Sequence, residues 1–322
     1  MILQTIGWIT LSVPLTTALT LGSIYWLSGR RRPSLTEQAR HQLLTEQVAF
    51  AFVKLSHGVT HYRLEGPQDQ PTFVFVHGVT NLAYTWHGYV DSLTRAGYQV
   101  LTFNLFGWGF SDRPGGRYDD AFFARQILEL LDALELHQPV HIVGNSLGGA
   151  IAAAFTARHR NRIQSLTIIA PAMVDQHNKP NWYFTAPIIG DWIFRVLGLA
   201  LLEQRFLQGV DPDDPHIPIF RQHFRTQAKF AGYEDSLLRT ARDFPLDAME
   251  PIYRSLAQIK NIPIHLVWAQ DDRVSPYRFA ALIKRLTPNV QLHVLETGGH
   301  GIVNSQQDFI QSILLNISVE VM

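Results

Sequence analysis

The chain has 322 residues, of which 46% are hydrophobic and 17% are charged, the composition of a globular protein with a full core. Lys plus Arg and Asp plus Glu both number 27, so the formal net charge is zero and no electrostatic case for nucleic-acid binding exists. Cysteine is absent, which excludes disulfides, thiolate metal sites and lipid attachment through cysteine.

The N-terminus is apolar. No charged residue occurs in Ile2–Leu27, and Arg30–Arg32 follow. A helix of that length would extend about 39 Å, more than the hydrocarbon core of about 30 Å. A cleaved signal peptide is the alternative, but neither a positive charge before the apolar run nor a small-residue cleavage site after it is present. We therefore predict a transmembrane anchor over residues 1–29. The arginines place the following domain in the cytoplasm, which gives a single-pass membrane protein.

A linker and the first strands are predicted next. Ser34–Glu37 resembles a capping box, and residues 30–50 are predicted to form a linker helix. Short β patterns follow at Ala51–Leu55 and Val59–Leu64. Helix and strand patterns then alternate through Ile169, which predicts an α/β fold with a mostly parallel, doubly wound sheet.

The first loop with chemical interest follows the apolar strand pattern Thr72–Val76. It begins with His77, Gly78 and Val79. A backbone N–H of such a loop is the usual second donor to an oxyanion beside a serine nucleophile, and Val79 is the best match. His77 is interpreted as a residue that shapes the loop rather than as a base.

Gly144–Gly148 carries the clearest chemical signal. It follows the buried-strand pattern Val140–Val143 and precedes the small-residue helix pattern Gly149–Ala154. A strand, the motif Gly-x-Ser-x-Gly and a helix are the context in which a serine is held on a sharp, strained turn. We interpret Ser146 as a nucleophile and the N–H of Leu147, at the start of the helix, as an oxyanion donor.

A serine nucleophile requires a base and an acid that orients the base. Ile264–Trp268 and Gln291–Leu295 are both predicted strands, and titratable residues follow each of them. Open α/β sheets gather their sites at the carboxyl ends of strands. His300, between two glycines, is the favoured base, and the earlier loop offers Asp271 and Asp272 as candidate acids.

These pieces together resemble the α/β-hydrolase superfamily, in particular its capped lipase and esterase branch, which is monoacylglycerol lipase-like and shares its cap with C–C hydrolases. The order Ser, acid, His is that of the family. Its common Asp-Arg-Val-x-Pro pattern aligns with Asp272, which leaves Asp271 as a solvated neighbour. Ser146 argues against the family members that use an aspartate nucleophile. The matching segments are His77-Gly78, Asn104–Pro114, Gly144–Gly149, Asp272 and Gly299-His300.

Residues 171–258 interrupt the alternation of helix and strand. They have helix-like periodicity with little strand signal, and the strand rhythm resumes at Ile264. We predict a helical cap over this segment, inserted between two parts of the core at 51–170 and 259–322. The family places a lid or cap at this point.

One part of the predicted cap, Pro187–Phe206, has more apolar residues than one buried face requires. Two interpretations are open: the side chains form the cap's own core, or some of them line a substrate path or touch a bilayer. Trp192 and Phe194 are the predicted substrate-binding residues of this segment.

The sequence predicts a membrane-anchored serine hydrolase that cleaves carboxylic esters of lipid-like or apolar acyl groups, through an acyl-enzyme on Ser146. His300 is the predicted base and Asp272 the predicted acid, and no cofactor or metal is implied. A C–C bond hydrolase of the ring-cleavage type is the first alternative, and a non-catalytic receptor of the same fold is the second. Nothing in the sequence indicates the oligomeric state or the acyl chain length.

Overall fold

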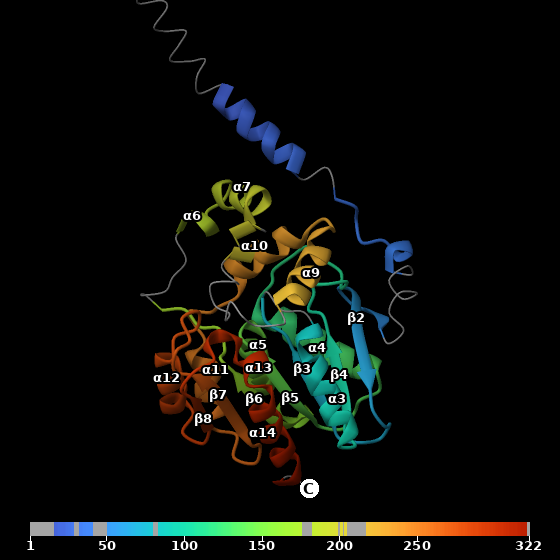
Figure 1. Cartoon of the computed structure of the whole chain (residues 1–322), viewed down its shortest axis with the longest axis vertical. Coiled ribbons are helices and arrows are strands. Elements are labelled where there is room, and N and C mark those ends of the chain that lie inside the picture. Colours follow the sequence, from blue (N-terminus) through green and yellow to red (C-terminus); the bar gives the residue numbers. More distant parts are fainter. Residues whose placement is uncertain are drawn as a thin grey trace, which may run out of the picture.

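The computed structural model describes residues 16–28, 32–40, 50–79, 83–175, 182–198, 200–201, 203–204 and 217–320. Its centre is an eight-stranded sheet with the strand order β1-β2-β4-β3-β5-β6-β7-β8 (Figure 1). The strands are β1 (Ala51–Leu55), β2 (Gly58–Glu65), β3 (Thr72–Val76), β4 (Gln99–Phe103), β5 (Val140–Asn145), β6 (Ile163–Ile169), β7 (Ile264–Ala269) and β8 (Gln291–Leu295).

The sheet is antiparallel at one edge and parallel elsewhere. β2 pairs antiparallel with β1 and β4, and every neighbouring pair from β4 to β8 is parallel. The prediction of a mostly parallel sheet is confirmed. All residues of β3, β4 and β7 are buried, as continuous apolar runs in parallel sheets require.

The strand order reverses at β3, which determines where the helices lie. The chain moves from β3 to β4 in one direction and then crosses to β5, β6, β7 and β8 in the other. Because such crossovers are right-handed, α3 (His87–Arg95) lies on the opposite face of the sheet from α4 (Asp120–Ala133) and α5 (Leu147–Arg158). α4 packs against α5, and the C-terminal helix α14 (Gln307–Glu320) packs against α3.

A helical insertion separates β6 from β7. Figure 1 shows α6 (Trp182–Thr185), α7 (Ile189–Val196), α9 (Ile217–Ala228) and α10 (Tyr233–Asp243) grouped beyond one end of the sheet. α10 contacts the other three, whereas α11 (Glu250–Leu256) packs against α5 and α12 (Arg278–Leu286) of the core. Of the predicted cap over 171–258, residues 176–181, 199, 202 and 205–216 lie outside the described residues.

None of the helices among the described residues is both long and apolar enough to cross a bilayer. The predicted single-pass membrane localisation, with the following domain in the cytoplasm, is therefore wrong. The rest of the predicted anchor, residues 1–15 and 29, lies outside the described residues.

The described N-terminal residues contact the rest of the molecule at several points. The indole N–H of Trp192 on α7 donates to the carbonyl of Leu21 at 3.0 Å. The guanidinium of Arg195 lies 4.3 Å from the centre of the Tyr25 ring. The helix over 16–28 therefore packs against α7.

Residues 32–40, which we call the N-terminal strap, connect the helical insertion to the core. The N–H of Ala231 donates to Pro33 O at 3.0 Å, and Arg32 forms an ion pair with Glu234 on α10. Arg40 is buried and forms an ion pair with Asp112. Within the predicted linker helix over 30–50, residues 37–40 are helical, and residues 30–31 and 41–49 lie outside the described residues.

Candidate active site

Ser146 occupies a sharp turn between a strand and a helix. β5 ends at Asn145, α5 begins at Leu147, and Ser146 between them has φ 55° and ψ −121°. A non-glycine residue at positive φ is strained, so the surrounding contacts must hold it there. The N–H of Ser146 donates to Ile169 O at 3.0 Å on the neighbouring strand, and its carbonyl accepts from Ala172 at 2.9 Å.

The glycines of this turn are required by space. A Cβ added to Gly144 would lie 2.2 Å from Gly148 O, and one added to Gly148 would lie 2.1 Å from Val76 O. Both contacts are with backbone atoms, which have no room to move. The helix α5 therefore starts in direct contact with β3 and β5, and this packing keeps Ser146 clear of the sheet.

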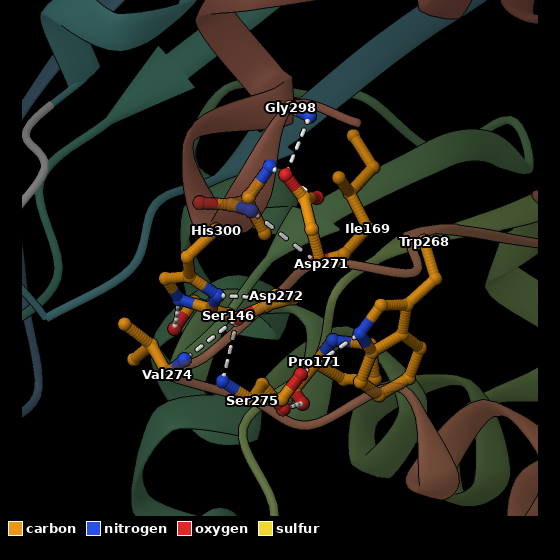
Figure 2. Close-up of polar contacts among 12 residues, drawn as sticks. Ser146, Ile169, Pro171, Trp268, Asp271, Asp272, Val274, Ser275, Gly298 and His300 are labelled. Carbon is orange, nitrogen blue, oxygen red and sulfur yellow. Dashed lines mark hydrogen bonds and ion pairs between the residues drawn. The ribbon is translucent and has the colours of Figure 1, made fainter. Parts of the chain in front are cut away.

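His300 and Asp272 lie in line with the serine hydroxyl (Figure 2). His300 Nε2 is 3.0 Å from Ser146 Oγ, and His300 Nδ1 is 2.8 Å from Asp272 Oδ2. The structure thus brings together the three predicted residues, which come from the ends of β5, β7 and β8. Because these strands run parallel, their carboxyl ends, and the residues that follow them, lie on the same side of the sheet.

The hydrogen bonds of Asp272 decide which nitrogen of His300 can act as a base. Asp272 Oδ1 accepts the N–H groups of Val274 and Ser275, both at 2.8 Å, and the carboxylate side chain is fully buried. An ionised carboxylate only accepts, so the proton of the imidazole belongs on Nδ1, facing Oδ2. Nε2 is then free to accept the proton of Ser146.

Two predicted oxyanion donors border the serine. Leu147 is the first residue of α5, where backbone N–H groups have no partner within the helix. Val79 follows β3, whose residue Val76 pairs with Gly144 at the end of β5. A Cβ added to Gly78 would lie 3.0 Å from Ser146 Cβ, so this loop passes directly beside the nucleophile.

The loop that holds Val79 is fixed by two buried aromatic side chains. The indole N–H of Trp108 donates to Val79 O at 2.6 Å. His77 is fully buried, and its Nδ1 lies 2.8 Å from Gly78 O. Burial lowers the pKa of His77 from 6.5 to about 4, so the ring is neutral at physiological pH. These contacts support the interpretation of His77 as a loop-shaping residue.

Ser275 links the acid loop to the nucleophile turn, and the sequence analysis missed it. Its hydroxyl donates to Pro171 O at 2.6 Å, one residue before Ala172, which contacts Ser146. Its carbonyl accepts the indole N–H of Trp268 at 2.9 Å. The serine is buried, and it occupies the unspecified position of the Asp-Arg-Val-x-Pro pattern, so the pattern gave no signal for it.

Asp271, the predicted solvated neighbour, is exposed. Its carboxylate also accepts the N–H groups of Gly298 at 3.3 Å and Gly299 at 2.8 Å (Figure 2). It therefore contacts the segment that carries His300.

The predicted substrate-binding residues of α7 have other contacts. Phe194 is half-buried and packs against the hydrophobic core, while Trp192 reaches Leu21. Their role in substrate binding stays a prediction. Within the described ranges, no group of three or more His, Asp or Glu side chains could hold a metal ion.

Known proteins are similar to this chain over most of its length and not only at the site residues. Among curated relatives, the 2-hydroxy-6-oxononadienedioate/2-hydroxy-6-oxononatrienedioate hydrolase of Cupriavidus pinatubonensis is 27% identical over 288 residues, covering 82% of this chain and 93% of the relative. The 2-hydroxymuconate semialdehyde hydrolase of Pseudomonas putida is 26% identical over 206 residues, covering 63% and 70%.

Solved structures show the same fold. The enol-lactonase from Burkholderia xenovorans LB400 has a TM-score of 0.70 at 19% identity, covering 84% of this chain and all of that one (100%). A hydrolase from Pseudomonas aeruginosa PA01 has a TM-score of 0.68 at 22% identity, covering 83% and 97%. The family model described as alpha/beta hydrolase fold matches residues 71–303, which is most of the chain. The chain therefore belongs to the alpha/beta hydrolase family.

Proposed function

We propose that this protein is a serine hydrolase that forms an acyl-enzyme on Ser146. The observation that carries the proposal is the line of hydrogen bonds from Ser146 Oγ through the two nitrogens of His300 to Asp272 Oδ2. A serine hydroxyl is a weak nucleophile, and this arrangement gives it a base at hydrogen-bond distance and a carboxylate that stabilises the base after it is protonated.

The proposed reaction proceeds in two halves. Ser146 Oγ attacks the carbonyl carbon while His300 Nε2 takes the hydroxyl proton, and the N–H groups of Leu147 and Val79 receive the oxyanion. His300 then gives its proton to the leaving group as the bond to the carbonyl carbon breaks. A water activated by His300 hydrolyses the acyl-enzyme. Each oxyanion donor is worth roughly 3–4 kcal/mol in the transition state at comparable sites.

C–C bond hydrolysis is the substrate reaction that we propose first. The curated relatives that support it are named for 2-hydroxy-6-oxo dienoates and a hydroxymuconate semialdehyde, and they match most of this chain. In such a substrate Ser146 would attack the ketone carbonyl. The carbon leaving group is delocalised over the conjugated system and takes up the proton that His300 carries.

Ester cleavage is the second candidate, because three arginines beside the helical insertion already have partners. Arg113 donates to the carbonyls of Ala231 and Gln227, at 3.0 Å each. Arg242 forms an ion pair with Asp191, and Arg278 forms one with Asp175. These three guanidiniums are engaged within the protein, which favours an uncharged acyl group over the carboxylates of a dioate at these residues.

Parallel assays of the purified protein distinguish the candidates. A 2-hydroxy-6-oxo-dienoate and a series of p-nitrophenyl esters from acetyl to decanoyl are compared by kcat/KM, with Ser146→Ala as the control. Preference for the 2-hydroxy-6-oxo-dienoate supports C–C hydrolysis. Preference for esters supports the second candidate, and a rise with chain length that Phe194→Ser abolishes would place Phe194 in the acyl site. Failure of a fluorophosphonate to label Ser146 would overturn both candidates and favour a non-catalytic receptor.

A further inference from the structure

Two adjacent acidic residues at the end of β7 contact the same loop in different ways. Asp272 accepts from the imidazole of His300, whereas Asp271 accepts from the backbone just before it, at Gly298 and Gly299 (Figure 2). Asp271 therefore contacts the polypeptide that carries the base, and it contacts neither the base nor the nucleophile.

The receiving backbone has the conformation that suits a carboxylate. Gly298 has φ 129° and Gly299 has φ 57°, values that favour glycine. Successive N–H groups in such a turn point to one side and form a small concavity that binds an anion. Asp271 fills it with one oxygen on each N–H, at 3.3 and 2.8 Å.

Other contacts fix the two ends of the loop, and the Ser305 hydroxyl lies 3.5 Å from Gly298 O. On the strand side, the N–H of Gln270 donates to Leu295 O at 2.8 Å and extends the pairing of β7 with β8. On the helix side, Ile302 is fully buried and the hydroxyl of Tyr89 donates to Val303 O at 2.6 Å. The carboxylate of Asp271 binds the backbone N–H groups in the middle of the loop, directly before His300.

We propose that Asp271 is a positioning residue that holds the backbone of the His300 loop so that Nε2 stays at hydrogen-bond distance from Ser146. The inference rests on the proposed function, since it assigns His300 the role of base. Positioning matters because a misplacement of about 1 Å between reacting groups can cost about 100-fold in rate. Asp271 itself touches no reacting atom.

The test compares Asp271→Ala, Asp271→Asn and the wild type, with Glu296→Ala as a matched control. Glu296 is an exposed carboxylate in the same loop, four residues before His300. Three quantities are measured: kcat and KM on the substrate that the wild type turns over, the rate of fluorophosphonate labelling of Ser146, and amide hydrogen exchange at Gly298–His300. Rates are normalised to the folded fraction of each variant.

We expect Asp271→Ala to lower kcat and the labelling rate about tenfold, to leave KM within about twofold, and to accelerate exchange at Gly298–His300. Asp271→Asn keeps one oxygen for the N–H of Gly299 and should recover most of the loss, and Glu296→Ala should match the wild type. Wild-type kcat and labelling in Asp271→Ala, or unchanged amide exchange, would overturn the inference alone. An unlabelled wild-type Ser146 would overturn the proposed function, and the positioning role with it.

Discussion

The backbone N–H of Leu105 donates to Nε2 of His77 at 3.0 Å. Because Nε2 accepts this bond, the proton of the neutral imidazole lies on Nδ1, where it is donated to Gly78 O at 2.8 Å. One buried ring thus joins the loop after β3 to the loop after β4. The geometry of Gly78 and Val79, beside Ser146, depends on this ring.

His77→Ala should therefore weaken both folding and activity. The variant leaves a buried N–H and a buried carbonyl without partners, at a cost of about 1–3 kcal/mol for each group. Urea unfolding should show the loss of stability. The residual activity per folded molecule should also fall, because Val79 is no longer held. Wild-type kcat in the folded fraction would show that the oxyanion loop does not depend on His77.

Stability should decrease in mild acid. Burial lowers the pKa of His61 to about 3, and those of His77, His141 and His265 to about 4, from an ordinary value of 6.5. Between pH 6.5 and about 4 the unfolded chain binds protons that the folded protein does not, so the free energy of unfolding falls as the pH is lowered through this window. Below about 4 the folded histidines protonate too, and the slope should flatten.

Urea midpoints at pH 7.5, 6 and 5 test this expectation. His141, which lies 2.7 Å from Ser165 Oγ on the neighbouring strand, can be replaced without touching the active site. His141→Gln should make the pH dependence shallower, since each pKa unit corresponds to roughly 1.4 kcal/mol. A slope identical to that of the wild type would mean that His141 is not a source of the acid sensitivity.

Loss of any member of the proposed triad should abolish turnover without unfolding the protein. Ser146→Ala and His300→Ala should each remove nearly all activity, and the double variant should be little worse, because the two residues act as one unit. Asp272→Asn should also be severe, since the amide would disturb the imidazole tautomer. Steady-state kinetics with circular dichroism as a folding control provide the test. Additive losses would argue against a shared proton transfer.

Gly148→Ala should destabilise the nucleophile turn. The new Cβ would lie 2.1 Å from Val76 O, which forces α5 away from β3. We expect the free energy of unfolding to fall by more than roughly 3 kcal/mol, as for a severely overpacked core. Activity should be lost even in the folded fraction. Gly115→Ala is the matched control, because its added Cβ meets nothing within 4 Å. Equal unfolding midpoints for the two variants would contradict the packing argument.

The parts of the site that the sequence predicted are those encoded by local pattern. The strand, turn and helix around Gly144–Gly148 follow from adjacent residues, and the parallel strands then bring Asp272 and His300 to the same edge. The bond from Leu105 to His77 joins segments far apart in the chain and leaves no periodic signal. The contacts of Asp271 could not be predicted either, because its partners, Gly298 and Gly299, lie in the loop after the next strand.

The membrane prediction failed for a different reason. The prediction rested on the absence of charged residues, and Ile2–Leu27 has none. A span also requires a helix that is both long and apolar enough to cross a bilayer, and none of the described helices meets that condition. Instead, the indole of Trp192 donates to Leu21 O in the helix over 16–28, so this apolar segment packs against α7. Composition alone does not predict that contact.

The family match begins at residue 71. The contacts of the N-terminal strap indicate that the part of the chain that unfolds together with the core begins earlier, at the strap. A fragment that starts at β1 would leave the Asp112 carboxylate without its buried guanidinium partner, Arg40, and the N–H of Ala231 without Pro33 O. The same cut would also remove the ion pair between Arg32 and Glu234 on α10 of the helical insertion. Limited digestion between the strap and β1 should therefore lower the melting temperature of the entire domain rather than trim an independent tail.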